Sequence, residues 1–243
     1  MWKSTVWTHR RCTGSVLILG CVLFQGGASL PVKDSTGTYI YGLPPQQWLG
    51  VVSLHPTLWW WASVLFLSGT FVTLLGFAQL TMLLRGAGDQ AFSSLGLIAL
   101  VVGAVLWVIV LAFRLSIDFS AAEETARTGV MPTFYVPLRE WTDALFAVYT
   151  ILTFLAALAF GGALVSTRLL PRWLGWTTIV YSLAGLGLFA AAHDMPPLFH
   201  HLLPIVMGIL LLLRRQQLPR ASHQKEALAA ASMVAVEEKE GSR

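Results

Sequence analysis

The apolar stretch FSSLGLIALVVGAVLWVIVLAF, residues 92–113, carries no charged residue and decides the fold. As a helix rising about 1.5 Å per residue it would extend about 33 Å, and a bilayer's hydrocarbon core of about 30 Å needs about 20 apolar residues. The stretch therefore predicts a transmembrane helix. Five further stretches show the same pattern with uneven strength, and we expect six spans at about 14–32, 58–84, 92–113, 144–165, 173–192 and 197–213.

The composition agrees with an all-α membrane bundle. Of the 243 residues 56% are apolar and 12% are charged, and the mean hydropathy is +0.67. Soluble domains carry about 25% charged residues, so most of this chain is expected to face lipid, and the lipid bilayer is its predicted partner. The net charge of +4 does not indicate nucleic-acid binding, because the basic residues are scattered at the ends of apolar runs and form no patch that would neutralise phosphates.

The first span leaves three interpretations open. A positive segment with Lys3 and Arg10-Arg11 precedes the short apolar run Gly14–Leu30, which fits a retained span or a cleaved signal peptide. A lipoprotein acylated at Cys21 is the third interpretation. Cys12 and Cys21 would lie about 13 Å apart on one helix, which is beyond disulfide reach, so we expect free thiols.

The sixth span is the shortest. Its uninterrupted apolar part, residues 202–213, is too short to cross a bilayer. We therefore expect the helix to begin near Pro197, with His200 and His201 at its outer mouth.

The basic residues predict the orientation, because Lys and Arg gather at the cytosolic ends of spans. With six spans and a cytosolic N-terminus, only Lys33, Arg114, Arg127 and Arg139 fall outside the cell. The other twelve fall inside, at Lys3, Arg10, Arg11, Arg85, Arg168, Arg172, Arg214, Arg215, Arg220, Lys225, Lys239 and Arg243. We expect a plasma-membrane protein with both termini cytosolic, in which residues 1–215 form the membrane domain and 216–243 a polar tail.

Two connections, 31–56 and 116–140, are long, and both fall on the outer side. Residues 46–54 predict a short amphipathic helix at the interface. In the second connection, Ser120 and Glu123 have the spacing of a capping box and predict a short polar helix that ends near Gly129. Together these elements would form an ordered cap.

The segment Leu-Leu-Pro-Arg-Trp-Leu-Gly-Trp, residues 169–176, resembles a family of uncharacterised bacterial six-helix membrane proteins. The entry to the second span, His55-Pro-Thr-Leu-Trp59, carries the same resemblance, which would cover roughly residues 14–214. It implies a fold of six helices and carries over no activity and no catalytic residue.

The polar residues near the outer face are the candidates for function, because hydrocarbon penalises unpaired polar groups. They would include an Arg114–Asp118 pair, Glu140 in the first turn of a helix, and a Trp59–Trp61 interfacial belt. A metal site would draw its ligands from His193, Asp194, His200, His201, His55 and Asp143, with Zn²⁺ as the metal that suits them.

The simpler interpretation is that these groups stabilise helix ends and bind water or headgroups. On that basis no cofactor and no catalytic residue is predicted, and a non-enzymatic structural, sensory or accessory membrane component is favoured. Two alternatives stay open. One is a small transporter or channel subunit, and the other is a metal-dependent membrane enzyme with Glu140 as general base.

Overall fold

The computed structural model describes residues 2–30, 40, 43–89, 91–192, 195 and 197–213. Residues Met1–Leu212 form one compact unit, and of the second unit, Leu213–Arg243, only Leu213 is described. All regular structure in the described part is helical. The helices are α1 (Trp2–Ser29), α2 (Pro45–Leu54), α3 (Pro56–Gly86), α4 (Phe92–Thr128), α5 (Tyr135–Thr167), α6 (Arg172–Ala192), the 3-10 helix η2 (Pro197–His201) and α7 (Leu202–Leu213).

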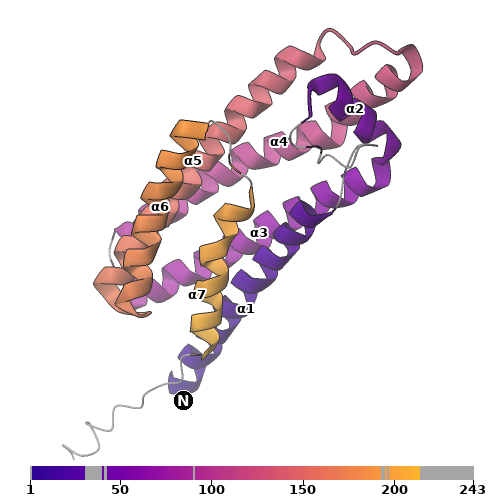
Figure 1. Cartoon of the computed structure of the whole chain (residues 1–243). Coiled ribbons are helices and arrows are strands. Elements are labelled where there is room, and N and C mark those ends of the chain that lie inside the picture. The colour runs from indigo at the N-terminus through magenta and orange to yellow at the C-terminus, as the bar shows by residue number, and fades with distance from the viewer. Residues whose placement is uncertain are drawn as a thin grey trace, which may run out of the picture. The chain divides into compact units, whose positions relative to one another are not determined.

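Five of these helices, α1, α3, α4, α5 and α6, are long and apolar enough to cross a membrane. The prediction of an all-helical membrane bundle is therefore confirmed, and Figure 1 shows the long helices side by side. The predicted sixth span is not confirmed. Residues 197–213 form only η2 and the 12-residue α7, and α7 is about 18 Å long.

Glycines allow α1 to pack closely against α3 and α7, and α6 to pack closely against α5. A Cβ added at Gly20 of α1 would lie 2.5 Å from the backbone nitrogen of Thr73 in α3. Gly14 and Gly208 face each other in the same way where α1 crosses α7, and Gly161 and Gly175 do so between α5 and α6. Small residues at such crossings are typical of membrane bundles. The close packing of α1 against α3 favours a retained first span.

Short turns join α3 to α4 and α5 to α6, as the sequence predicted. In the first turn the Asp89 carboxylate accepts a hydrogen bond of 2.7 Å from the Ser93 backbone N–H and so satisfies a donor in the first turn of α4. In the second, Arg168 is in the left-handed conformation with φ 55° and ends α5.

The predicted outer loop at 116–140 is wrong. The helix α4 continues without interruption to Thr128, and α5 begins at Tyr135. Ser120 lies inside α4 and starts no helix of its own, so the predicted capping box is also wrong. The predicted stop is confirmed, because Gly129 has φ 73° and ends α4 as a left-handed C-cap. Glu140 lies beyond the first turn of α5.

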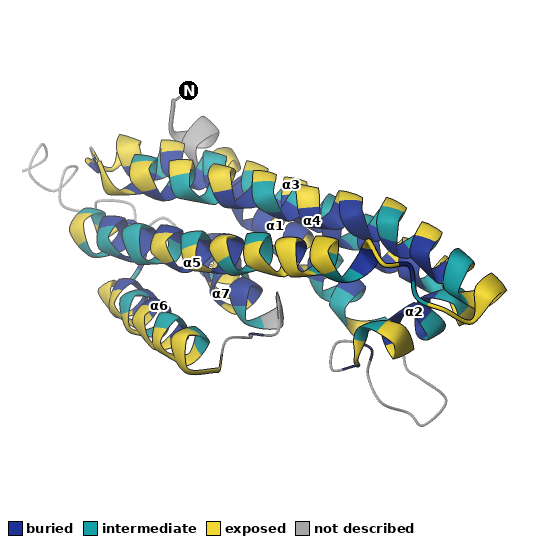
Figure 2. Cartoon of the chain, turned by 90° about the horizontal axis from the view of Figure 1, so that it is seen from above, coloured by how far each residue is buried: buried dark blue, intermediate teal, exposed yellow. Residues whose placement is uncertain are grey.

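The predicted helix at 46–54 is confirmed as α2, which packs on the polar extensions of α4 and α5. Its buried residues Trp48, Leu49, Val51 and Val52 join one hydrophobic cluster with Trp59 of α3, Phe113 and Ala121 of α4, and Tyr135 of α5. Figure 2 shows this buried surface where α2 meets the ends of the long helices. An ordered cap therefore covers this end of the bundle.

The predicted interfacial belt of Trp59–Trp61 is only partly correct. Trp60 and Trp61 are exposed, but Trp59 is fully buried. The two cysteines are free thiols as expected, Cys12 exposed and Cys21 buried.

Candidate functional site

Two buried polar clusters stand out in the described part of the chain. The first, here called the cap cluster, comprises Trp48, Arg114, Asp118, Tyr135 and Arg139. The Asp118 side chain is 1% exposed. It accepts a hydrogen bond of 3.3 Å from the Trp48 indole N–H and one of 2.9 Å from the Tyr135 hydroxyl, and Arg139 donates to that hydroxyl at 3.4 Å.

The two guanidinium groups of the cap cluster lie against tryptophan rings. Arg114 lies 3.9 Å from the centroid of Trp59, and Trp59 in turn donates its indole N–H to the Arg114 carbonyl oxygen at 3.1 Å. Arg139 lies 4.0 Å from the centroid of Trp48. Such contacts stabilise a cation that is removed from water. The cap cluster thus joins α2, α3, α4 and α5 through hydrogen bonds and cation–π contacts, which is the arrangement expected of a structural cluster.

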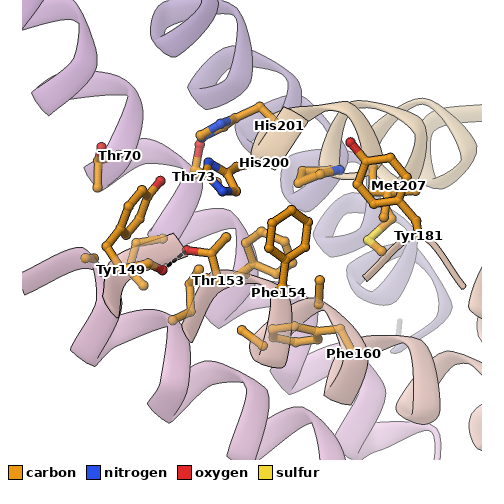
Figure 3. Close-up of a pocket in the computed structure, with 18 residues that line it drawn as sticks. Thr70, Thr73, Tyr149, Thr153, Phe154, Phe160, Tyr181, His200, His201 and Met207 are labelled. Carbon is orange, nitrogen blue, oxygen red and sulfur yellow. Dashed lines mark hydrogen bonds between the residues drawn. The ribbon is translucent and has the colours of Figure 1, made fainter. Parts of the chain in front are cut away.

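The second cluster, here called the histidine pocket, lies halfway along the bundle. Its cavity of about 50 Å³ is bounded by α3, α4, α5, α6, η2 and α7. Figure 3 shows its polar side chains converging from these elements. They are Thr70 and Thr73 from the middle of α3, Tyr149 and Thr153 from the middle of α5, Tyr181 of α6, and His200 and His201 of η2.

His200 is the unusual residue of the pocket. Its side chain is 7% exposed, and its ring packs against Tyr149 and Phe154 with centroid distances of 5.3 and 5.2 Å. Within the described residues neither ring nitrogen has a hydrogen-bond partner. A buried polar group without a partner costs about 1–3 kcal/mol, so an imidazole in this state calls for a further explanation.

His201 is placed differently. Its ring stacks on Phe24 of α1 with centroids 3.7 Å apart and an interplanar angle of 21°. The two adjacent histidines therefore anchor η2 to different helices, and His200 lies against α5. Their position at the outer mouth of a span stays a prediction, and both side chains are buried against the neighbouring helices rather than exposed.

Three of the hydroxyl groups around the cavity already donate their protons to backbone carbonyl oxygens. Thr70 donates to the Phe66 carbonyl oxygen at 2.7 Å, and Thr153 donates to that of Tyr149 at 2.8 Å. Tyr181 donates to the Phe199 carbonyl oxygen at 2.7 Å. A hydroxyl has one proton and two lone pairs, so these three groups can still accept hydrogen bonds.

The other predicted site residues do not join this pocket. His55 is exposed between α2 and α3, and the Asp143 carboxylate is 70% exposed and lies 3.9 Å from the Arg139 side chain. Glu140 is exposed. His193 and Asp194 lie outside the described residues. Among the residues that are described, no three His, Cys, Asp or Glu side chains are grouped closely enough to hold a metal ion.

Sequence reasoning missed Tyr149, Thr153 and Thr70, since isolated hydroxyls in apolar runs carry no pattern. One signal did exist for His200. The orientation rule assigns Arg214 to the cytosolic surface. A helix that runs from Arg214 back to His200 is about 21 Å long. That length ends inside a bilayer rather than at its far side.

Comparison with family models, with characterised proteins and with solved structures gave no significant match to this chain. The class of protein is therefore defined by the fold and the pocket. It is a helical protein with several helices apolar enough to span a membrane and a mostly apolar cavity into which a few polar side chains project.

Proposed function

We propose that this chain is a non-enzymatic, multi-pass membrane component that binds a small ligand in the histidine pocket, in a sensory or accessory role. The observation that carries this proposal is His200, a buried imidazole that lines a cavity while both ring nitrogens lack a partner in the described part of the chain. A bound ligand or ordered water would satisfy these nitrogens. Polar residues at membrane depth mark ligand and ion sites by default.

The position of the pocket along the helices supports a site near the middle of the membrane. Along α3, Trp60 and Arg85 are about 37 Å apart, and along α5, Trp141 and Arg168 are about 40 Å apart. These residue types favour the interfaces, and the distances match the roughly 40–45 Å of a bilayer with its headgroups. Thr73 lies close to the midpoint of the first pair.

The same geometry supports both ends of the bundle lying on one side of the membrane, and from the basic residues we propose that this is the cytosolic side of the plasma membrane. A Cβ at Gly14 in α1 would lie 3.1 Å from the Leu212 side chain, so the end of α7 lies beside the first part of α1. In this proposal η2 and α7, residues 197–213, form a sixth crossing. The resemblance of residues 169–176 to uncharacterised six-helix membrane proteins agrees with this topology and adds no activity.

A small transporter is the second candidate, and the short α7 favours it. Many transporters place their substrate site at the midplane, where a discontinuous helix exposes backbone groups. Here a 3-10 turn with two histidines precedes a 12-residue helix at the edge of the cavity. Irregular backbone at membrane depth is tolerated where it lines a cavity.

Histidine NMR of the protein in lipid nanodiscs tests the binding proposal. With [15N]histidine labelling, a panel of small polar solutes is titrated, and His200→Phe identifies the pocket signal. We expect a saturable shift of that signal, while His55→Gln leaves the titration unchanged. If no solute moves the His200 signal, the pocket is a closed structural cluster. Solute flux into proteoliposomes then decides between a binding component and a transporter.

A further inference from the structure

We infer that the histidine pocket selects small uncharged molecules that are rich in hydrogen-bond donors, of the amide and alcohol class. This inference rests on the proposed function, because it names the ligand class of the same site. It follows from three properties of the cavity, namely the direction of its hydrogen bonds, its charge and its size.

Three hydroxyls of the cavity offer acceptors alone. The hydroxyls of Thr70, Thr153 and Tyr181 each donate to a backbone carbonyl oxygen at 2.7 or 2.8 Å, and each retains lone pairs. Neutral His200 adds one acceptor nitrogen and one donor N–H. The hydroxyls of Tyr149 and Thr73 also line the cavity and can donate. A ligand that combines one acceptor with several N–H or O–H groups would therefore satisfy the lining, whereas a ligand with acceptors alone would leave the lone pairs of Thr70, Thr153 and Tyr181 unmet.

The cavity carries no formal charge that would hold an ion. Its lining contains no Asp, Glu, Lys or Arg. Moving an ion into an apolar interior without a counter-charge is far more costly than moving a neutral polar molecule. The aromatic faces of Tyr149, Phe154 and Phe160 suit a flat uncharged molecule.

The size of the cavity limits the ligand to a few atoms. A water molecule needs about 10–15 Å³ of such volume, so about 50 Å³ holds roughly four non-hydrogen atoms. Urea has this size and carries four N–H donors around one carbonyl group. Acetone and guanidinium have nearly the same shape, but acetone has no donor and guanidinium is charged.

The experiment compares these three probes on the full-length protein in nanodiscs, using the His200 ring signals in histidine NMR. We expect saturable binding of urea in the millimolar range, and binding at least tenfold weaker for acetone and for guanidinium. If acetone binds as tightly as urea, the inferred selectivity for hydrogen-bond donors is wrong. If guanidinium binds as tightly as urea, the inferred preference for uncharged ligands is wrong. In both cases the pocket remains a binding site and the proposed function stands.

Two isosteric variants test the acceptors directly. Thr153→Val and Thr70→Val each remove one lining hydroxyl, and each should weaken urea binding about fivefold, the effect of one hydrogen bond. Thr178→Val is the matched control, because Thr178 is buried, donates to the Leu174 carbonyl oxygen at 2.7 Å and does not line the cavity. Its urea affinity should stay within twofold of wild type.

Each outcome of the variant series has a distinct meaning. If the Val variants bind urea like wild type while His200→Phe abolishes binding, the hydroxyls are not ligand acceptors and the inference is wrong. If none of the three probes moves the His200 signal in the folded protein, the inference fails, and the broader solute panel then decides the proposed function. Circular dichroism and gel filtration of each variant confirm that it is folded.

Discussion

The cap cluster and the histidine pocket are both buried, and they differ in charge and in the partners of their central side chains. In the cap cluster the Asp118 carboxylate accepts two side-chain hydrogen bonds, and each arginine lies over a tryptophan ring. In the pocket neither ring nitrogen of His200 has a hydrogen-bond partner among the described residues. One region is a charged network around a carboxylate, and the other is an uncharged cluster beside a cavity.

This difference assigns different roles to the two clusters, one to stability and the other to binding. A buried polar network stabilises a fold when its members are satisfied, and an unsatisfied member lowers stability unless a ligand or water completes it. Charge alone is therefore a poor guide in this chain. The strongly charged cluster is expected to hold the cap, while the uncharged cluster is the candidate for binding.

The largest effect is expected for Asp118→Ala. The substitution leaves the Trp48 N–H and the Tyr135 hydroxyl without their acceptor and removes the buried negative charge between two arginines. We expect the free energy of unfolding to fall by about 3 kcal/mol, measured by denaturant titration in detergent micelles. Asp118→Asn keeps one oxygen acceptor, so its free energy of unfolding should fall by less. A loss below about 1 kcal/mol for the alanine variant would contradict a structural role.

A smaller loss is expected for Gly20→Ala, which tests the wall of the pocket. The new Cβ would meet the backbone of Thr73, a lining residue, at 2.5 Å. Overpacking of this kind costs about 2 kcal/mol, so the unfolding midpoint should fall. Gly50→Ala is the control, because an added Cβ there has nothing within 4 Å. Equal stability of both variants would mean that α1 does not pack on α3, as after cleavage of a signal peptide.

Paired substitutions in the two clusters are expected to change stability in opposite directions. His200→Phe replaces an unpartnered ring with an apolar ring of similar shape and should stabilise the protein by about 1 kcal/mol. Tyr135→Phe removes a hydroxyl that donates to Asp118 at 2.9 Å and should destabilise it by about 1 kcal/mol. Thermal unfolding in the same detergent measures both. A destabilised His200→Phe variant would indicate that the imidazole is already satisfied.

The long apolar runs made much of the bundle predictable. The expected ranges 58–84 and 173–192 nearly match α3 and α6, and Gly129 ends α4 as predicted. However, a helix can continue beyond the residue at which its apolar stretch ends, as α4 does. Residues 114–128 contain no Gly or Pro, so nothing in the backbone stops α4 where its hydropathy falls, and packing of α2 supports the polar extension.

The pocket was hidden for a related reason. Apolar periodicity reports which residues face lipid or core, but it does not report the depth at which a short helix begins. The sequence placed His200 at an outer surface, because a full-length span was assumed. The convergence of Thr70, Thr153 and Tyr181 depends on how three helices pack, which no local pattern encodes.

The smallest effect is expected for Asp143→Asn, which marks the limit of the cap cluster. The carboxylate is 70% exposed and 3.9 Å from the Arg139 guanidinium, so solvent screens the pair and its contribution should stay below about 0.5 kcal/mol. Arg139 would keep its contact with the Trp48 ring. The same denaturant titration applies, with Asp118→Asn measured beside it. A loss for Asp143→Asn that equals the loss for Asp118→Asn would show that burial does not set the strength of these contacts, and the contrast between the two clusters would lose its physical basis.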